Sequence, residues 1–318
     1  MKDLLNRLVP AFGPSGREQE IGKVIADLAR PWGEVSADPM GNLIVRRPGP
    51  GKRVMVAAHM DSLGIVATYL EDGGFVRFGA LGGLRLAWLL GRTVRFESGV
   101  TGVVCVDEDV ELKDLKVTQL YVDTAGQTVE LGESAVICGQ PLFAGDFVTS
   151  PYLDNRIGCA VALKALELAR DTENDLYFVF TVQEEVGIRG AKPAAYTVDP
   201  QMAVAVDVCA SGDAPGGEKN NPVKLGAGPV VKFLDKSTIC HPAVTQALLQ
   251  AGQALDIPCQ KYAAAAGGTD AGAIHQSRGG VPTGILSIAT RYIHSGSEIC
   301  SLRDAEQCAA VLAKAVSL

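Results

Sequence analysis

A small set of side chains in this 318-residue chain combines the residue types that bind divalent metal ions with a spacing that places most of them at the ends of apolar runs. These side chains are His59, Asp61, Asp154, Glu184, Glu185, Asp207 and His294. Carboxylate oxygens and imidazole nitrogens suit zinc, cobalt or manganese, and a carboxylate can bridge two such ions about 3.5–4 Å apart. One acid is then left for proton transfer, so the pattern predicts metal-assisted hydrolysis.

His59 and Asp61 follow the apolar run RVMVAA with one residue between them. Residues i and i+2 of an extended strand point the same way, so both side chains face one side at the strand end. One imidazole nitrogen could then bind a metal ion while the carboxylate holds the other nitrogen and fixes the tautomer. The alternative is a surface His–Asp pair without a metal ion.

Glu184 and Glu185 come directly after the apolar run LYFVFTVQ. Adjacent side chains that leave a buried strand point in different directions, so one carboxylate can bind metal while the other stays free. Glycines follow in VGIRGA, and the carboxyl ends of strands are where α/β sheets place their sites. A solvated acidic turn is the alternative.

Three further candidates also stand near apolar segments. Asp207 ends AVAVDV, where an unpaired charge would be costly, so it is either a metal ligand, half of a buried ion pair, or a helix cap. Asp154 precedes NRIGCAVALKAL and is either the N-cap of that helix or a bridging ligand. His294 follows an apolar strand. His241 and His275 have no acidic residues of this kind near them in the sequence, so we expect both to be structural.

Local patterns predict the elements that must position these residues. Ser15 and Glu18 have the spacing of a capping box, and apolar residues at helical spacing predict a helix over 16–30. The β-rich runs at 42–47 and 53–58 are separated by a turn segment and predict a hairpin or neighbouring strands.

The predicted domain organisation follows from a change in the pattern of apolar runs along the chain. Short apolar runs separated by glycine and acidic turns predict a small all-β domain over 64–148. Strands alternate with helices after it, which indicates an α/β sheet covered on both faces. Because candidate ligands lie on both sides of the insertion, 1–63 and 149–318 should form one catalytic domain.

Composition narrows the class of protein further. The net charge is −7 and the charged residues are not gathered in blocks, so the charge pattern does not indicate binding to nucleic acid or to an anionic membrane. The apolar run at the start is too short for a signal peptide or a membrane span, so we expect a cytoplasmic protein. Eight cysteines without a CxxC pair indicate buried apolar residues in a reducing compartment.

The ordered motifs AAHMDSLG, SPYLDNRIGCAVAL, TVQEEVGIRGA, DVCASGDAPG, GGTDAGAI and RYIHS closely resemble the M42 family of dinuclear metallo-aminopeptidases over nearly the whole chain. The resemblance implies two divalent ions, zinc or cobalt or else manganese, bridged by Asp154. The other ligands would be His59, Glu185, Asp207 and His294. Asp61 would orient His59, and Glu184 would be the general base. Ser62 stands where the family usually carries an acidic residue.

The resemblance also implies a mixed sheet, a PDZ-like or β-barrel-like insertion used in oligomerisation, peptide substrates, and assembly into a dimer or a tetrahedral dodecamer. Other amide hydrolases on the same scaffold, such as a carboxypeptidase or an N-acyl amino acid deacylase, are the main alternative. A non-catalytic shell protein is a third. Arg189, Arg278 and Arg291 are candidates for recognising acidic substrates, with a structural or surface role as the alternative.

Overall fold

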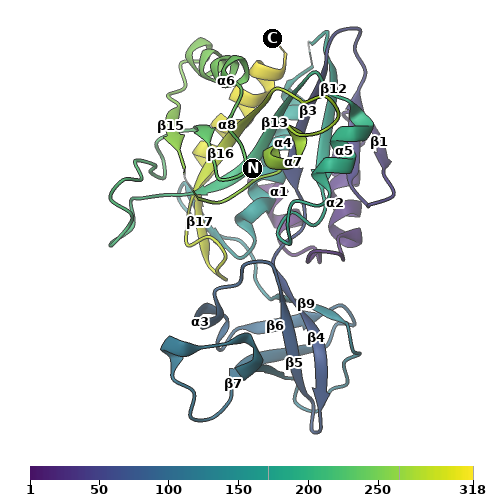
Figure 1. The fold of residues 1–318 in the computed structure, drawn as a ribbon, viewed down its shortest axis with the longest axis vertical. Coiled ribbons are helices and arrows are strands. Elements are labelled where there is room, and N and C mark those ends of the chain that lie inside the picture. The colour runs from purple at the N-terminus through teal and green to yellow at the C-terminus, as the bar shows by residue number, and fades with distance from the viewer. Residues whose placement is uncertain (171, 265, 318) are drawn as a thin grey trace.

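The computed structural model describes residues 1–170, 172–264 and 266–317, which form an α/β layer and a small β barrel beneath it (Figure 1). In spatial order the path of the large sheet is β1 (Glu34–Ala37), β2 (Leu43–Arg47), β12 (Asp175–Thr181), β3 (Arg53–His59), β13 (Met202–Ala210), β16 (Thr283–Arg291), β17 (Glu298–Ser301), β11 (Phe147–Ser150) and β10 (Leu142–Ala144). Off this path, β14 (Val230–Leu234) pairs with β16 and with β15 (Gln260–Ala263). The expected mixed sheet is confirmed, because β12, β3, β13 and β16 run parallel, whereas β2 pairs antiparallel with β12 and both β14 and β17 pair antiparallel with β16.

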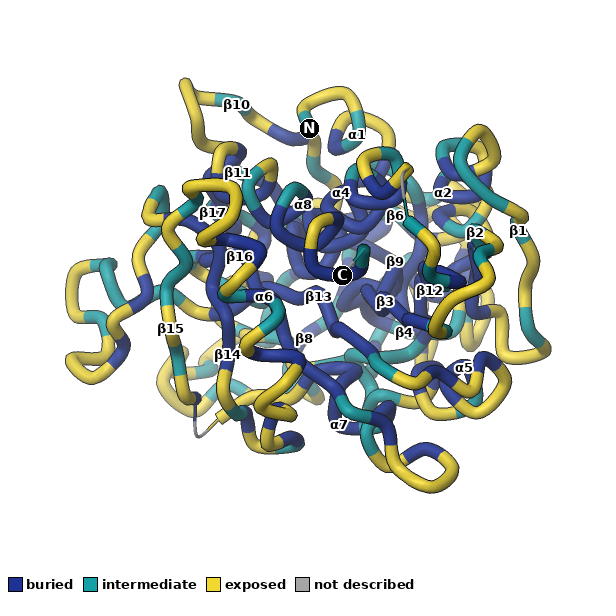
Figure 2. Tube along the Cα trace, turned by 90° about the horizontal axis from the view of Figure 1, so that it is seen from above, coloured by how far each residue is buried: buried dark blue, intermediate teal, exposed yellow. Residues whose placement is uncertain are grey.

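The parallel centre of the sheet is buried on both faces, as its near-continuous apolar sequences require (Figure 2). Helices α1 (Lys2–Leu8), α2 (Gln19–Ala29), α4 (Leu153–Leu168), α6 (Pro242–Ala254) and α8 (Leu302–Val316) pack together on one face. Helices α5 (Ala191–Val198) and α7 (Ala271–Ile274) cover the other. Helix α4 is apolar around its circumference and lies at the centre of its layer, where nearly all of its side chains are buried.

The barrel closes six antiparallel strands into a ring, which confirms the expected β-barrel-like insertion. Around the ring they are β4 (Gly64–Glu71), β5 (Phe75–Leu81), β8 (Leu120–Asp123), β7 (Thr101–Val106), β6 (Thr93–Phe96) and β9 (Ser134–Ile137). Helix α3 (Leu86–Leu89) lies between β5 and β6, and the 3₁₀ turns η1 (Leu112–Asp114) and η2 (Val117–Gln119) lie between β7 and β8. The expected boundary at 148 lies too far along the chain, because β10 and β11 pair within the large sheet.

Two local expectations were wrong. The predicted helix over 16–30 begins later, as α2, and has no capping box, because the Ser15 hydroxyl donates to Asp61 Oδ2 (2.6 Å) instead of capping the helix. Strands β2 and β3 are not a hairpin, since β12 lies between them and pairs with both. In each case a partner distant in sequence replaces the local one.

All eight cysteines are free, and most are buried. Among the residues described above, no helix has both the length and the apolar character needed to cross a membrane.

Candidate metal centre

The parallel strands bring three of the predicted segments to one edge of the sheet. His59 is the last residue of β3 and lies opposite Thr181, the last residue of β12. Glu184 and Glu185 therefore lie in the turn just beyond this edge. The pairing of β13 with β3 reaches Ala205 opposite Ala57, so that two residues further on Asp207 is level with His59.

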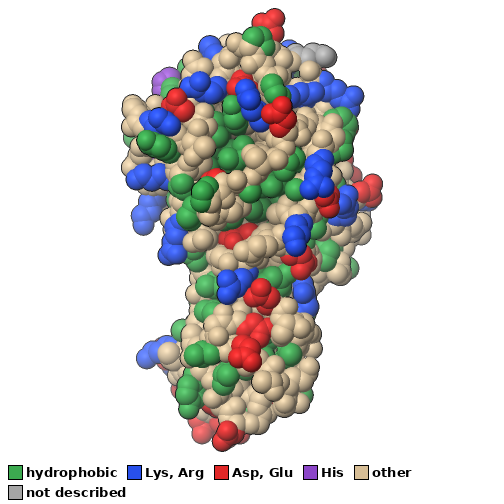
Figure 3. All heavy atoms as spheres, turned by 90° about the vertical axis from the view of Figure 1, so that its right-hand side faces the viewer, with side chains coloured by type: hydrophobic (Ala, Val, Ile, Leu, Met, Phe, Trp, Pro, Cys, Tyr) green, Lys and Arg blue, Asp and Glu red, His purple; other side chains and the backbone are tan. Residues whose placement is uncertain are grey.

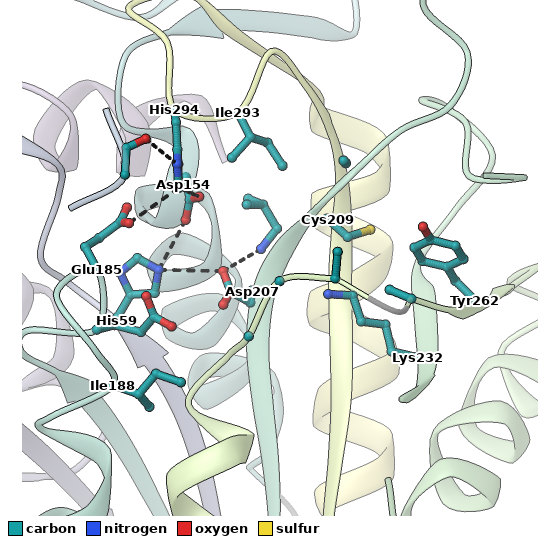
Figure 4. A pocket seen from close by; sticks show the side chains of 18 of the residues that line it. His59, Asp154, Glu185, Ile188, Asp207, Cys209, Lys232, Tyr262, Ile293 and His294 are labelled. Carbon is teal, nitrogen blue, oxygen red and sulfur yellow. Dashed lines mark hydrogen bonds and ion pairs between the residues drawn. The ribbon is translucent and has the colours of Figure 1, made fainter. Parts of the chain in front are cut away.

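Asp154 and His294 reach the same place from two other segments (Figure 4). Asp154 lies at the start of α4, where its own backbone is not helical, and His294 follows β16. Glu298 joins the two segments, because its carboxylate accepts from the backbone N–H of Asp154 (2.8 Å) and from that of His294 (2.8 Å). Sequence reasoning missed Glu298; an acid four residues after a candidate ligand was the available signal.

The ligand-type side chains form two adjoining groups that share Asp154. In the first, His59 Nε2 lies 3.2 Å from Asp154 Oδ1 and 3.6 Å from Asp207 Oδ1. In the second, His294 Nε2 lies 3.4 Å from Asp154 Oδ2 and 3.4 Å from Glu185 Oε2. The ligand atoms of each group lie within 4.8 Å of one another. Asp154 thus offers one oxygen to each group.

Asp61 lies behind the first group and organises it. Its carboxylate is 3.5 Å from His59 Nδ1 and accepts the backbone N–H groups of Glu184 (2.9 Å) and Glu185 (3.2 Å) as well as the Ser15 hydroxyl. Burial alone would raise the pKa of Asp61, but these hydrogen bonds outweigh it and the net pKa is lowered. Asp61 therefore contacts the imidazole, through its carboxylate and through its backbone carbonyl (3.2 Å from His59 Nδ1), and holds the turn that carries both glutamates.

The electrostatics of the cluster call for added positive charge. Burial raises the pKa of Glu184 and of Glu185 well above the ordinary value and also raises that of Asp207. Glu185 Oε1 is buried and has no hydrogen-bond partner. Carboxylates buried in this way are stable when they coordinate metal, and the oxygen and nitrogen donors match zinc, cobalt or manganese. The residues present therefore fit divalent ions.

A second buried acid that sequence reasoning missed is Asp270, in the GGTDAG segment. It accepts a hydrogen bond from the Thr181 hydroxyl (2.6 Å), and its Oδ1 has no partner. Burial raises its pKa to about 7. The signal was an acid in a glycine-rich loop, although nothing in the sequence indicated that this loop meets the end of β12.

Outside the cluster, the two other histidines are structural, as expected. His241 caps α6, where its Nδ1 accepts the N–H of Ala243, and His275 contacts the Ala271 carbonyl within its own turn.

The cluster opens into a pocket of about 620 Å³. The arginines considered from the sequence do not line it, because Arg278 pairs with Asp199 and Arg291 pairs with Asp213, while Arg189 also lies outside the lining. The lysine and arginine side chains that line it are Lys232 and Arg85.

A mixed sheet with two acid–histidine groups at the carboxyl ends of its parallel strands is typical of the class of metal-dependent hydrolases.

Comparison with known proteins narrows this class. The family model of the M42 glutamyl aminopeptidases matches residues 41–311. A putative aminopeptidase of Acetivibrio thermocellus is 42% identical over 99% of this chain and 98% of its own length. The chain therefore belongs to the M42 family and is a metal-dependent aminopeptidase.

Solved structures agree with this assignment. Aminopeptidase APDkam598 from the archaeon Desulfurococcus kamchatkensis matches with a TM-score of 0.95 at 33% identity, covering 99% of this chain and 94% of that one. The TET1 peptidase of Pyrococcus horikoshii, described as assembling into a tetrahedron or a large octahedral shell, matches with a TM-score of 0.88 at 29% identity over 99% and 98% of the two chains.

Proposed function

We propose that this aminopeptidase uses two divalent metal ions to release N-terminal residues from peptides, with Glu184 as the general base. The observation that carries the proposal is the pair of ligand groups that share Asp154, with the carboxylate of Glu184 lining the same pocket. A metal site that serves only storage or structure does not require an additional carboxylate in the pocket where a substrate would bind.

In this proposal each ion would be held by one group. The first group offers His59, Asp154 and Asp207, and the second offers Asp154, Glu185 and His294. When bound, such ions supply Lewis acidity that polarises the scissile carbonyl and makes water more acidic. Zinc or cobalt, or else manganese, suits these donors.

Glu184 then moves the proton. Its carboxylate takes a proton from the attacking water and passes it to the departing amine, which needs a carboxyl group that is stable in both states. Burial and the neighbouring acids Asp207, Asp270 and Glu185 raise the pKa of Glu184, while His59 opposes them, so the protonated form is accessible. Asp61 holds the backbone N–H of Glu184 and keeps its side chain in place.

Glu184→Gln tests this role. We expect the variant to keep its bound metal and to lose about 100-fold or more in kcat on an aminoacyl p-nitroanilide, within the range for a general base. Metal analysis and steady-state kinetics on the same sample measure both. Glu130→Gln, an exposed barrel residue outside the pocket, is the matched control. A Glu184→Gln enzyme with near wild-type turnover would rule out Glu184 as the base.

Substrate blocking separates the proposal from its alternatives. An aminopeptidase requires a free α-amine, so a peptide should be cleaved and its N-acetylated form should not. Cleavage of the acetylated form would indicate a deacylase or a carboxypeptidase on this scaffold. A metal-loaded protein that cleaves neither would favour a non-catalytic shell protein.

We also propose that the enzyme prefers acidic N-terminal residues. Lys232 is 6% exposed, lines the pocket, and forms no ion pair with any residue that the structure describes. The Lys232 charge acts on Asp207 without a direct ion pair, and a buried ammonium group of this kind favours an anionic ligand. Lys232 lies on the side of Asp207 and Tyr262, away from Glu185 and His294 (Figure 4), where the side chain of a bound residue could reach it.

Lys232→Met tests this preference. The ratio of kcat/KM for glutamyl over leucyl p-nitroanilide should fall by about tenfold or more, the loss typical of a charged hydrogen bond. Lys224→Met, an exposed neighbour on the loop before β14, should keep the wild-type ratio. A wild-type preference for leucine would overturn the acidic preference and leave the aminopeptidase proposal standing.

Self-association is the remaining part of the proposal. The TET1 peptidase of similar fold is described as assembling into a tetrahedron or a large octahedral shell, and we propose that this chain also associates, as a dimer or a dodecamer, through its inserted barrel. Light scattering coupled to gel filtration measures the mass of the assembly. A monomer at all concentrations would exclude it.

A further inference from the structure

One segment of the barrel lies directly against the metal-ligand candidates. A Cβ placed on Gly82 would lie 3.2 Å from Glu185 Cβ, and one placed on Gly83 would lie 3.1 Å from His294 Nδ1. The Gly83 carbonyl in turn accepts from His294 Nδ1 at 3.0 Å. Two glycines thus allow the barrel backbone to approach the second ligand group, and the chain continues from there to Arg85.

Arg85 is a cation without an acidic partner. It is exposed at the pocket, and among the described residues its recorded contact is with the ring of Trp88, whose centroid lies 4.7 Å from the guanidinium carbon. Stacking on an aromatic ring holds a guanidinium flat and leaves its N–H groups free for a carboxylate.

The aromatic support continues into a second hollow. Trp88 and Tyr292 form an edge-to-face pair with centroids 6.3 Å apart, and both line a shallow hollow of about 580 Å³ next to the pocket. Ile293 and His294, the next residues after Tyr292, line the main pocket. The two hollows therefore share the segments 83–92 and 292–297.

From these contacts we infer that Arg85, supported by Trp88, binds the free C-terminal carboxylate of short peptide substrates. The inference rests on the proposed aminopeptidase function. Lys232 lies beside the first ligand group and Arg85 beside the second, so a peptide whose N-terminal side chain points to Lys232 has its remaining residues directed towards the barrel. A planar guanidinium can bind a carboxylate that arrives there through two N–H groups.

The test compares free-acid and C-terminally amidated alanine peptides of two to eight residues. We expect wild-type kcat/KM to favour the acid by about tenfold at one short length, in line with a charge-assisted hydrogen bond, and to show no preference at eight residues. In Arg85→Ala the acid-to-amide ratio should fall to about one at every length, and Arg85→Lys should restore part of it. The ratio within each variant cancels any general loss of activity.

Arg278→Ala is the matched control. Arg278 also lies over an exposed ring, that of Tyr196 at 4.0 Å, but lies outside the pocket, so this variant should keep the tenfold preference. The inference is overturned if the wild type shows one ratio at all lengths, if Arg85→Ala keeps the preference, or if Arg85→Ala changes the assembly mass while the ratio stays constant. If no alanine peptide and no aminoacyl p-nitroanilide is cleaved at all, the proposed function itself fails.

Discussion

The α/β layer buries acidic side chains together at the ends of its strands, whereas none of the acids that the structure describes in the barrel is buried. Asp154, Asp207 and Glu298 are each less than 10% exposed and lie next to other acids. In the barrel, Arg77 pairs with Glu71 (2.6 Å) and Asp107 (2.7 Å) at the surface. The two parts meet at a waist (Figure 3).

The difference separates function from stability. A group of buried carboxylates is unfavourable in isolation and persists in a fold only where something compensates the charge. The barrel has no such cluster among its described residues, and its interior of Phe96, Val104 and Val122 stabilises the fold by ordinary apolar burial. Changes to the clustered acids of the layer should therefore affect metal binding, and changes in the barrel core should affect stability.

The largest effect is expected from Asp154→Ala, which removes the carboxylate common to both ligand groups. We expect less than one tightly bound ion per chain and a loss of at least about 1,000-fold in kcat/KM, since ligands that act as a unit are lost together. Elemental analysis and kinetics measure the two quantities. Asp175→Ala, which removes a buried acid paired with Arg46 (3.0 Å) in the same sheet, should keep its ions. Two ions retained in Asp154→Ala would contradict the shared role.

The converse change is Phe96→Ala in the barrel core. Phe96 is fully buried, and truncation should destabilise the barrel by about 3–5 kcal/mol through lost burial and a cavity. Calorimetry measures the transition, and the metal content of the folded protein should be that of the wild type. Loss of metal before any unfolding transition would show that the two parts are not separable in this way.

The sequence predicted the strands of the α/β layer better than the contacts that hold the candidate ligands in place. The apolar runs that became β3, β12 and β13 were visible because parallel strands buried on both faces are continuous in hydrophobicity. The residues that hold the ligands in place were not visible. Glu298 acts through two backbone N–H groups, and Asp270 meets Thr181 across the sheet, so neither role has a local signature.

Ser15 is a case in which a local sequence rule was satisfied but a contact distant in sequence formed instead. Its spacing to Glu18 satisfied a local helix rule, yet its hydroxyl donates to Asp61, which no neighbouring residue could have indicated. Arg85 and Lys232 likewise became visible only once the fold placed them in the pocket, whereas the arginines near the motifs in sequence are paired elsewhere.

A smaller effect is expected from Glu298→Gln. The amide has one acceptor oxygen, so one of the two backbone N–H groups, that of Asp154 or that of His294, loses its partner. Supporting residues of this kind typically change metal affinity by about 10–100-fold. Competition with a metal chelator measures the affinity, and Glu130→Gln serves as the control. Unchanged affinity would show that Glu298 does not position the ligands.

The smallest effect concerns the pH dependence of the chelated protein. Burial raises the pKa of Asp270 to about 7 and that of Glu298 to about 8. The folded state then binds more protons than the unfolded state, whose carboxyl groups titrate near about 4, so stability falls as pH rises between these values. Each such group contributes about 1.4 kcal/mol per pH unit, or roughly 2 °C in Tm for a chain of 318 residues.

Bound divalent ions should reduce this slope, because their charge stabilises the ionised cluster. Thermal unfolding of chelated and metal-loaded protein from pH 5 to pH 8 measures the difference, and chelated Glu298→Gln should have a shallower slope than the chelated wild type because one raised carboxyl is gone. A Tm that rises with pH in the chelated wild type would contradict the raised pKa values of Asp270 and Glu298, and the contrast between the two parts would be lost.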